Sequence, residues 1–277
     1  MRIYISADME GITGLVDADD VQPGGRDYER GRQMMAEDVN AAVRGAVAAG
    51  ATDIVVNDAH GPMRNLVPEA LHPQARLIRG RPKNMGMLEG LTPGHDAMIC
   101  VGYHSRAGTL GVLSHSFMGH EIEDIWLDGR PVGEIGLAHA TAATLGVPLV
   151  ALTGDDSACA ETTAWDDSVT AVAVKSAHDR FAAELRPAAE ARQAIEEAVI
   201  TGLSAYPRKA PTPISNSSTL TVRWQSATVA STLLGIPGVT SVDSRTVETN
   251  GQLTALYRLF GVWMRVAASL TNQPPYC

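Results

Sequence analysis

The chain has 277 residues, an apolar fraction of 45% and a formal net charge of −9. This length suffices for a large buried core in one domain or two, and the apolar fraction is ordinary for a soluble globular protein. The negative charge argues against nucleic acid or an anionic membrane as the main partner. No apolar run approaches the roughly 18 residues that a membrane-spanning helix needs.

Three cysteines, Cys100, Cys159 and Cys277, lie far apart in the sequence. An odd number at such spacings predicts a reducing, cytoplasmic setting without a disulfide framework. Cys100 and Cys159 are more typical of buried apolar positions than of nucleophiles. The N-terminus offers one Arg and then a short apolar run broken by Asp8, so we expect no signal peptide.

The first predicted element is a strand that begins at Ile3, where Ile3 and Ile5 alternate with more polar residues. Apolar residues at helical spacings then predict a helix over 26–49, ended by Gly50. A short apolar run over 52–58 is typical of a buried parallel strand. Further along we predict strands at 75–79, 96–102, 122–127, 130–132, 148–153 and 170–175, and helices at 133–145, from 155, and at 187–203.

Strands that alternate with helices predict an α/β fold with a mostly parallel sheet flanked by helices. The Pro-rich stretch 208–213 is a predicted linker. We therefore expect an α/β metal-binding catalytic domain over 1–207 and a smaller C-terminal α+β lobe over 208–277, which forms a separate unit or an added layer of the same domain. In that lobe the predicted strands are 218–223 and 239–242, and the predicted helices are 225–234 and 252–270.

Polar side chains follow three of the apolar strands. Asp8 and Glu10 follow the first, His60 follows the second, and His104 follows the strand over 96–102. In open α/β sheets, ligand sites lie outside the carboxyl ends of the strands. Two neighbouring carboxylates repel each other unless a cation or a shared proton lies between them. Imidazole and carboxylate together suit zinc and related divalent ions, although surface acids and a hydrogen-bonded loop histidine would explain each residue taken alone.

Two further residues lie near this predicted rim. His115 lies in a polar loop after the His104 strand, and Glu134 begins an Ala-rich helix. An acid at the start of a helix often serves only to stabilise the helix through its dipole. The remaining histidines show no acidic or imidazole partner at a telling spacing, and we interpret them as structural or surface residues: His72, His95, His120, His139 and His178.

Several short motifs occur in an order that resembles the zinc-dependent D-aminopeptidases of the DppA-like family. They are DMEGITG at 8–14, NDAH at 57–60, GYHSR at 102–106, SHS at 114–116 and RPVGEIG at 130–136, with YERGR at 28–32, LHP at 71–73, EG at 89–90 and GDD at 154–156 between and after them. Five motifs in one order are far more specific than any single one. The resemblance weakens beyond about residue 160.

The resemblance implies a dinuclear site with two zinc ions per subunit. Asp8 would bridge the metals, Glu10 and His60 would complete one site, and His104 and Glu134 the other. It also implies a catalytic role for His115, as a general acid/base or as a nucleophile. A further implication is a large ring-like homo-oligomer, a decamer of paired pentamers.

The predicted function is an aminopeptidase that releases N-terminal, D-configured residues from short peptides. Asp58, Asp155 and Asp156 are candidates to bind the substrate ammonium, although each is better explained as a helix cap or as a group that orients a ligand. The alternatives are another dinuclear hydrolase, such as an amidase or a phosphoesterase, and a non-catalytic metal- or peptide-binding protein. A structural zinc site tends to be saturated by protein ligands, so five ligands shared by two metals favour catalysis.

Overall fold

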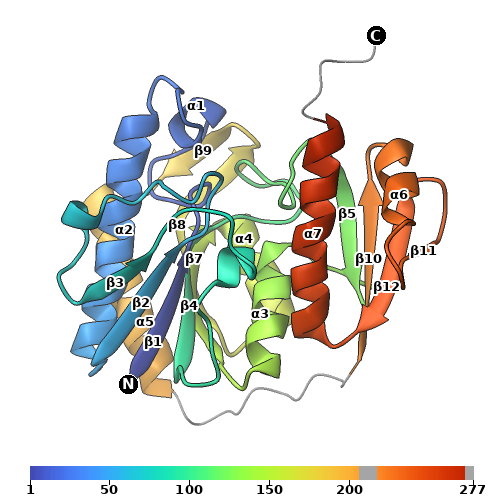
Figure 1. The fold of residues 1–277 in the computed structure, drawn as a ribbon. Coiled ribbons are helices and arrows are strands. Elements are labelled where there is room, and N and C mark those ends of the chain that lie inside the picture. The colour runs from blue at the N-terminus through green and yellow to red at the C-terminus, as the bar shows by residue number, and fades with distance from the viewer. Residues whose placement is uncertain (206–216, 272–277) are drawn as a thin grey trace.

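In the computed structural model of this chain, which describes residues 1–205 and 217–271, two β-sheets lie on either side of helices α3 (Glu134–Thr144) and α7 (Leu253–Thr271) (Figure 1). The larger sheet is parallel except for its edge strand β9. Its order is β3 (Ala75–Ile78), β2 (Asp53–Asp58), β1 (Arg2–Ala7), β4 (Ala97–Tyr103), β7 (Leu149–Asp155), β8 (Thr170–Asp179) and β9 (Ala182–Leu185). The predicted α/β fold class is therefore confirmed.

The alternation of side chains in β1 assigns each face of the larger sheet to different helices. Ile3 and Ile5 belong to the apolar cluster formed with α2 (Tyr28–Ala48) and α5 (Ala188–Ala205). Tyr4 belongs to the opposite cluster, which includes α3 and α7. Successive strand residues point to opposite faces, so one strand contributes to both cores.

Helix α2 shows how the local sequence sets these boundaries. Met35, Val39 and Val43 recur every four residues and are fully buried. Gly50 has a φ of 91° just after the helix, a left-handed conformation that ends helices and that glycine adopts without steric cost.

The smaller sheet is antiparallel and draws its strands from two distant parts of the chain. Asp128 and Gly129 both have positive φ, at 52° and 77°, which matches the twist of the predicted hairpin between β5 and β6. The order is β11 (Thr240–Ser241), β12 (Thr246–Gly251), β10 (Ser218–Trp224), β5 (Ile122–Leu127) and β6 (Arg130–Pro131). Strand β5 thus pairs with the C-terminal strand β10, and β6 pairs with β5 at the edge.

The predicted boundary at 207/208 and the linker 208–213 lie outside the described residues. Shorter elements complete the described part of the chain. They are α1 (Ala18–Val21), α4 (Asp156–Trp165), α6 (Ala227–Leu233), and the 3₁₀ turns η1 (Pro68–Ala70) and η2 (Gly86–Leu88).

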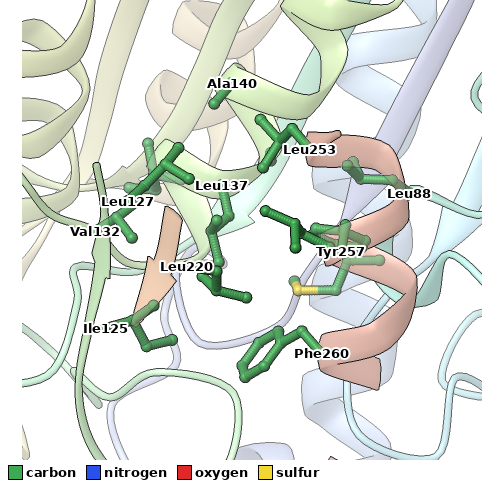
Figure 2. Packing of buried hydrophobic residues seen from close by; sticks show 14 of the residues in the cluster. Leu88, Ile125, Leu127, Val132, Leu137, Ala140, Leu220, Leu253, Tyr257 and Phe260 are labelled. Carbon is green, nitrogen blue, oxygen red and sulfur yellow. The ribbon is translucent and has the colours of Figure 1, made fainter. Parts of the chain in front are cut away.

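A single buried cluster connects the two sheets. Figure 2 shows Leu127 and Leu220 of the smaller sheet beside Leu137 of α3, with Tyr257 and Phe260 of α7 close by. The same cluster reaches Tyr4 and Cys100 of the larger sheet. Because apolar burial stabilises in proportion to the area removed from water, this shared core holds α7 against the larger sheet. No helix within residues 1–205 and 217–271 has the length and apolar character needed to cross a bilayer.

Candidate metal centre

The candidate site lies where the direction of the sheet order changes. From β1 the chain continues to β2 and β3 on one side, whereas β4, β7 and β8 lie on the other. In doubly wound sheets the helices that follow such a pair of strands leave a crevice at their carboxyl ends. Asp8 follows β1, His104 follows β4 and His60 follows β2 at this edge.

Two glycines let the loop after β1 touch the end of β4. A Cβ at Gly11 would lie 2.0 Å from the carbonyl oxygen of Tyr103, and a Cβ at Gly102 would lie 2.4 Å from the carbonyl oxygen of Asp8. The Gly11 amide donates to the Gly102 carbonyl over 2.8 Å. Only residues without a side chain allow this approach, which brings Asp8 next to His104.

A buried lysine holds the same loop from its other side. The Lys175 ammonium, on β8, donates to the carbonyl oxygens of Glu10, Ile12 and Leu15 at 2.6, 2.9 and 2.5 Å. These carbonyls lie outside regular structure, where the backbone supplies few donors; of the three, the Ile12 carbonyl also accepts from the Leu15 amide. Burial lowers the pKa of Lys175 to about 8. The sequence shows no motif around Lys175, and its role arises only from the fold.

The five predicted ligands converge on one buried cluster. His104 Nε2 lies 3.6 Å from Asp8 Oδ2 and 3.4 Å from Glu134 Oε2, while His60 Nε2 lies 3.1 Å from Glu10 Oε1. Asp8, Glu10, His104 and Glu134 are each at most 6% exposed. Ligand atoms of Asp8, His104 and Glu134 lie within 4.8 Å of one another, which is the spacing of one metal site.

A second group within the same spacing differs from the predicted second site. It consists of Glu10, His104 and His115, whereas His60 contacts Glu10 without joining a group of three. The structure therefore brings His115 close enough to be a ligand as well as a catalytic residue. The assignment of His60, rather than His115, to the same metal as Glu10 stays a prediction.

The buried donor atoms fit a metal centre. Within the described residues, Asp8 Oδ2, Glu10 Oε2 and His104 Nε2 are buried without a hydrogen-bond partner. Leaving such atoms unpaired costs about 1–3 kcal/mol each, and more when they are charged. His104 Nδ1 lies 3.0 Å from the Ser105 carbonyl, so it carries the proton and Nε2 is free to coordinate. Carboxylate oxygens and imidazole nitrogens are zinc donors.

The charges of these groups shift one another's pKa values, so their protonation states depend on each other. Burial raises the pKa of Asp8 well above its ordinary value, and the charges of Glu10 and Glu134 raise it further. Burial alone would lower the pKa of His60, but Glu10 and Asp8 raise it to about 9. The carboxylates beside His104 likewise raise its pKa. Protons thus compensate part of the negative charge, and a divalent cation would displace them on binding.

His115 is held in one orientation by its own loop. Its Nδ1 lies 2.8 Å from the Leu113 carbonyl, so Nδ1–H donates there and Nε2 faces Glu10 and Glu134 at 3.9 and 4.0 Å. The ring stacks on His104 with centroids 4.1 Å apart. Burial, together with the neighbouring His104 charge, lowers the pKa of His115.

The backbone on both sides of His115 is unusual. Leu113 and Phe117 have φ values of 53° and 57°, a region that non-glycine residues seldom adopt. The Phe117 amide donates to Glu134 Oε1 over 2.5 Å, which couples this loop to α3. Strained backbone of this kind persists where the surroundings dictate it, often at functional sites.

The three aspartates that the sequence suggested for binding the substrate ammonium already accept hydrogen bonds from other groups of the protein. Asp155 is the N-cap of α4 and accepts from the Ala158 and Val112 amides. Asp58 accepts from the Asn65 side chain and the Leu66 amide, and Asp156 accepts from the Ala177 amide. These contacts agree with the capping and supporting roles that the sequence favoured.

Two of the other histidines have partners outside the cluster, and one of these partners was not evident from the sequence. His139 Nε2 lies 3.1 Å from Asp166 Oδ2, a contact between residues 27 positions apart. His95 is buried with its ring edge against Tyr4. Neither residue lines the cavity at the metal cluster.

That cavity has a volume of about 600 Å³, within the usual range for small-ligand sites. Asp8, Glu10, His60, His115 and Glu134 line it. The lining also includes residues that sequence reasoning missed, most of which come from the segment after β3 and from α7. Those residues are Arg81, Lys83, Met87, Phe117, Tyr257, Met264 and Arg265.

Comparison with known proteins identifies the family. Residues 1–262 match the family model Peptidase_M55, described as D-aminopeptidase. A D-aminopeptidase of Bacillus subtilis (strain 168) is 41% identical over 197 residues, which cover 71% of this chain and 72% of that protein. Among solved structures, the Zn-dependent D-aminopeptidase DppA of Bacillus subtilis, described as a self-compartmentalizing protease, has a TM-score of 0.94 at 33% identity, with full coverage of both chains. A match over nearly the whole sequence and fold leaves no doubt about descent: this chain is a member of the D-aminopeptidase family of peptidases.

Proposed function

We propose that this chain is a zinc-dependent aminopeptidase that releases N-terminal D-amino acids from short peptides. The observation that carries the proposal is a set of donor atoms of Asp8, Glu10 and His104 that are buried without a hydrogen-bond partner among the described residues. Asp8 and Glu10 also line one open cavity. Membership of the D-aminopeptidase family favours peptides over phosphate esters or other amides. The cavity beside the cluster favours catalysis over a closed structural site.

The proposed centre holds two zinc ions per subunit. Asp8 would be shared by both ions, His104 and Glu134 would complete one site, and Glu10 and His60 the other. The short Glu10–His60 and His104–Glu134 contacts support this division. Zinc held there would supply Lewis-acid chemistry and a bound water with a pKa lowered to about 7.

We assign proton transfer to His115. Its Nδ1–H is anchored on Leu113, so the Nε2 lone pair faces the cavity and can accept a proton from water, then return it to the leaving amine. A nucleophilic role would instead leave a covalent adduct on Nε2.

Metal content tests the ligand division. Purified protein should hold about two zinc ions, and Glu134→Ala and His60→Ala should each hold about one, because each removes a ligand from one site. His115→Ala should keep both ions and lose on the order of 10²–10⁴ in kcat, the usual value of a positioned proton-transfer group. Loss of a zinc ion in His115→Ala but not in His60→Ala would show that His115 is the ligand. No bound metal in the parent protein would overturn the proposal.

Stereochemistry is tested on matched dipeptides. D-alanyl-D-alanine should be hydrolysed in the presence of zinc and not after chelation, and L-alanyl-L-alanine should be the poorer substrate. Equal rates for both would reject the D-preference while leaving the peptidase assignment intact.

We further propose a homo-oligomer, a decamer in the ring-like arrangement that the resemblance implies, in the cytoplasm. Support comes from the solved relative, described as a self-compartmentalizing protease. Exposed apolar side chains, including Leu110 at 66% and Phe181 at 54%, offer surface for contacts between copies. A particle mass in solution near one or two copies of the 29.3 kDa chain would contradict a decamer.

A further inference from the structure

The cavity at the metal cluster is lined by acidic and by basic side chains. The three carboxylates that line it, Asp8, Glu10 and Glu134, all belong to the metal cluster and would be balanced there by the proposed zinc ions. Three basic side chains, Arg81, Lys83 and Arg265, line the same cavity outside that cluster. Their positive charge favours a ligand that carries an anionic group.

Lys83 and the two arginines differ in how many of their N–H donors already bind other groups of the protein. Lys83 is buried, and its ammonium donates to Asn57 Oδ1 at 2.7 Å and to the Asp58 carbonyl at 2.6 Å. These bonds fix the segment after β3 against β2, so Lys83 shapes the wall and adds positive potential. The ammonium has little donor capacity left for a ligand.

Among the residues that the structure describes, the two arginines leave most of their donors without a protein acceptor. Arg265 on α7 gives one hydrogen bond, to the Lys83 carbonyl at 3.1 Å, and Arg81 gives one of 3.4 Å to the Gly61 carbonyl. Within the part of the chain that the structure describes, neither guanidinium has a carboxylate within 4 Å. Each guanidinium carries five N–H donors in a fork that matches a carboxylate.

Glu89 is an alternative partner for Arg265, because both side chains line a neighbouring hollow. Its Oε2 accepts from the Met85 amide at 2.7 Å, and it forms no ion pair with Arg265 among the described residues. Arg265 therefore stays available to the larger cavity.

The remainder of the cavity lining is mostly apolar. Met87, Phe117 and Met264 belong to it, so the cavity suits small uncharged side chains. A short free peptide matches such a lining, with its amine at the metal cluster, its C-terminal carboxylate at the basic side chains and little charge between. A longer peptide with its N-terminus at the metal cluster would carry its carboxylate past the arginines.

We propose that Arg81 and Arg265 bind the free C-terminal carboxylate of the substrate and so restrict the enzyme to short peptides with an unblocked C-terminus. This inference rests on the proposed peptidase function, since it identifies the substrate end that faces away from the metals. Carboxylate binding by an arginine fork is a charge-assisted contact, among the stronger hydrogen bonds in proteins.

The test compares D-alanyl-D-alanine with its C-terminal amide, which differs only in the charge at that end. The wild-type enzyme should have a kcat/KM about 10-fold or more higher for the free acid, because hydrogen bonds to charged groups are worth that factor. In Arg81→Gln and Arg265→Gln, kcat/KM for the acid should fall about 10-fold, mainly through KM, while the amide is hydrolysed as before.

Arg258→Gln is the matched control, because Arg258 lies on the same helix but lines only the neighbouring hollow. It should leave the acid-to-amide ratio unchanged. Equal hydrolysis of acid and amide by the wild type, or an equal loss for both substrates in the variants, would overturn the subsite alone. Failure of the zinc-loaded wild type on both substrates would overturn the proposed function, and the subsite with it.

Discussion

At the scale of single residues, the chain places buried charges where they organise the site. Lys175 supplies donors to three loop carbonyls, and Asp38 on α2 supplies an acceptor to the Thr13 amide over 2.8 Å. Arg192 on α5 lies 3.6 Å from Asp38, and Lys175 also faces it. The loop that carries Glu10 is thus held from two directions by groups outside any recognisable motif.

Asp38 predicts a pH dependence of stability. Burial raises its pKa to about 6, against roughly 3.9 in an unfolded chain. The folded state therefore binds the proton more tightly. This contribution to stability is fully present below pH 4 and is lost as the pH rises through about 6. Asp38→Asn mimics the protonated form, so its free energy of unfolding relative to wild type should increase by about 2 kcal/mol between pH 4 and pH 7.

Denaturant unfolding at a series of pH values, with chelator present, measures this difference. Asp53→Asn is the control of opposite sign, because hydrogen bonding to Arg76 lowers the pKa of Asp53. Relative to wild type it should become less stable as the pH rises. A pH-independent difference between Asp38→Asn and wild type would show that Asp38 is ionised in the folded state.

At the scale of elements, the contact between the loop after β1 and the end of β4 sets the geometry of the cluster. Gly11→Ala would place a methyl group 2.0 Å from the Tyr103 carbonyl and force the two segments apart. We expect a loss of about 2–4 kcal/mol in the free energy of unfolding and a lower zinc content.

Gly261→Ala, in the middle of α7, provides the contrast. A Cβ there meets no atom within 4 Å, so this variant should gain about 0.5–1 kcal/mol from the lower entropy of its unfolded chain. Thermal or denaturant unfolding of the two variants beside wild type is the measurement. A Gly11→Ala protein as stable as wild type and fully loaded with zinc would contradict the argument.

The strands and helices with a strong apolar pattern were predictable, and the weakly patterned ones were not. The run over 96–102 anticipates β4, and the spacing in 26–49 anticipates α2, because burial dictates both. Strand β12 was missed, because Thr246–Gly251 is mostly polar and pairs through its backbone. The exposed edge strand β9 was missed for the same reason, and β8 runs on to Asp179 because it pairs with β9.

Some residues of the candidate site were likewise predictable from the sequence, and others were not. Asp8, His60 and His104 were predictable as neighbours, because each follows a parallel strand and such strands end at one edge. Arg81 and Arg265 were not, since no motif marks them and their proximity arises from packing of α7 against the segment after β3. Tertiary contacts between distant segments leave no local pattern in the sequence.

At the scale of the whole molecule, the two sheets form one unit through α3 and α7. Strand β5 pairs with β10, and its Ile125 and Leu127 pack in the shared core. A chain that ends at residue 205 would lose β10, β12 and α7, leaving the edge of β5 and the apolar face of α3 exposed.

We therefore expect the 1–205 fragment to aggregate or remain partly unfolded, with no cooperative thermal transition in circular dichroism. The full chain under the same conditions is the control. A soluble fragment with a sharp transition would show that the larger sheet folds independently of the smaller one.

The position of α7 has a consequence for synthesis of the protein. Leu253, where α7 begins, follows Glu134 by 119 positions, so a nascent chain holds all five proposed ligands well before it holds the cavity wall formed by α7. At about 5–20 residues per second, translation of that interval takes roughly 6–24 s. Throughout that time the growing polypeptide lacks part of the cavity lining, so we expect the proposed peptidase activity to begin only once α7 has been made.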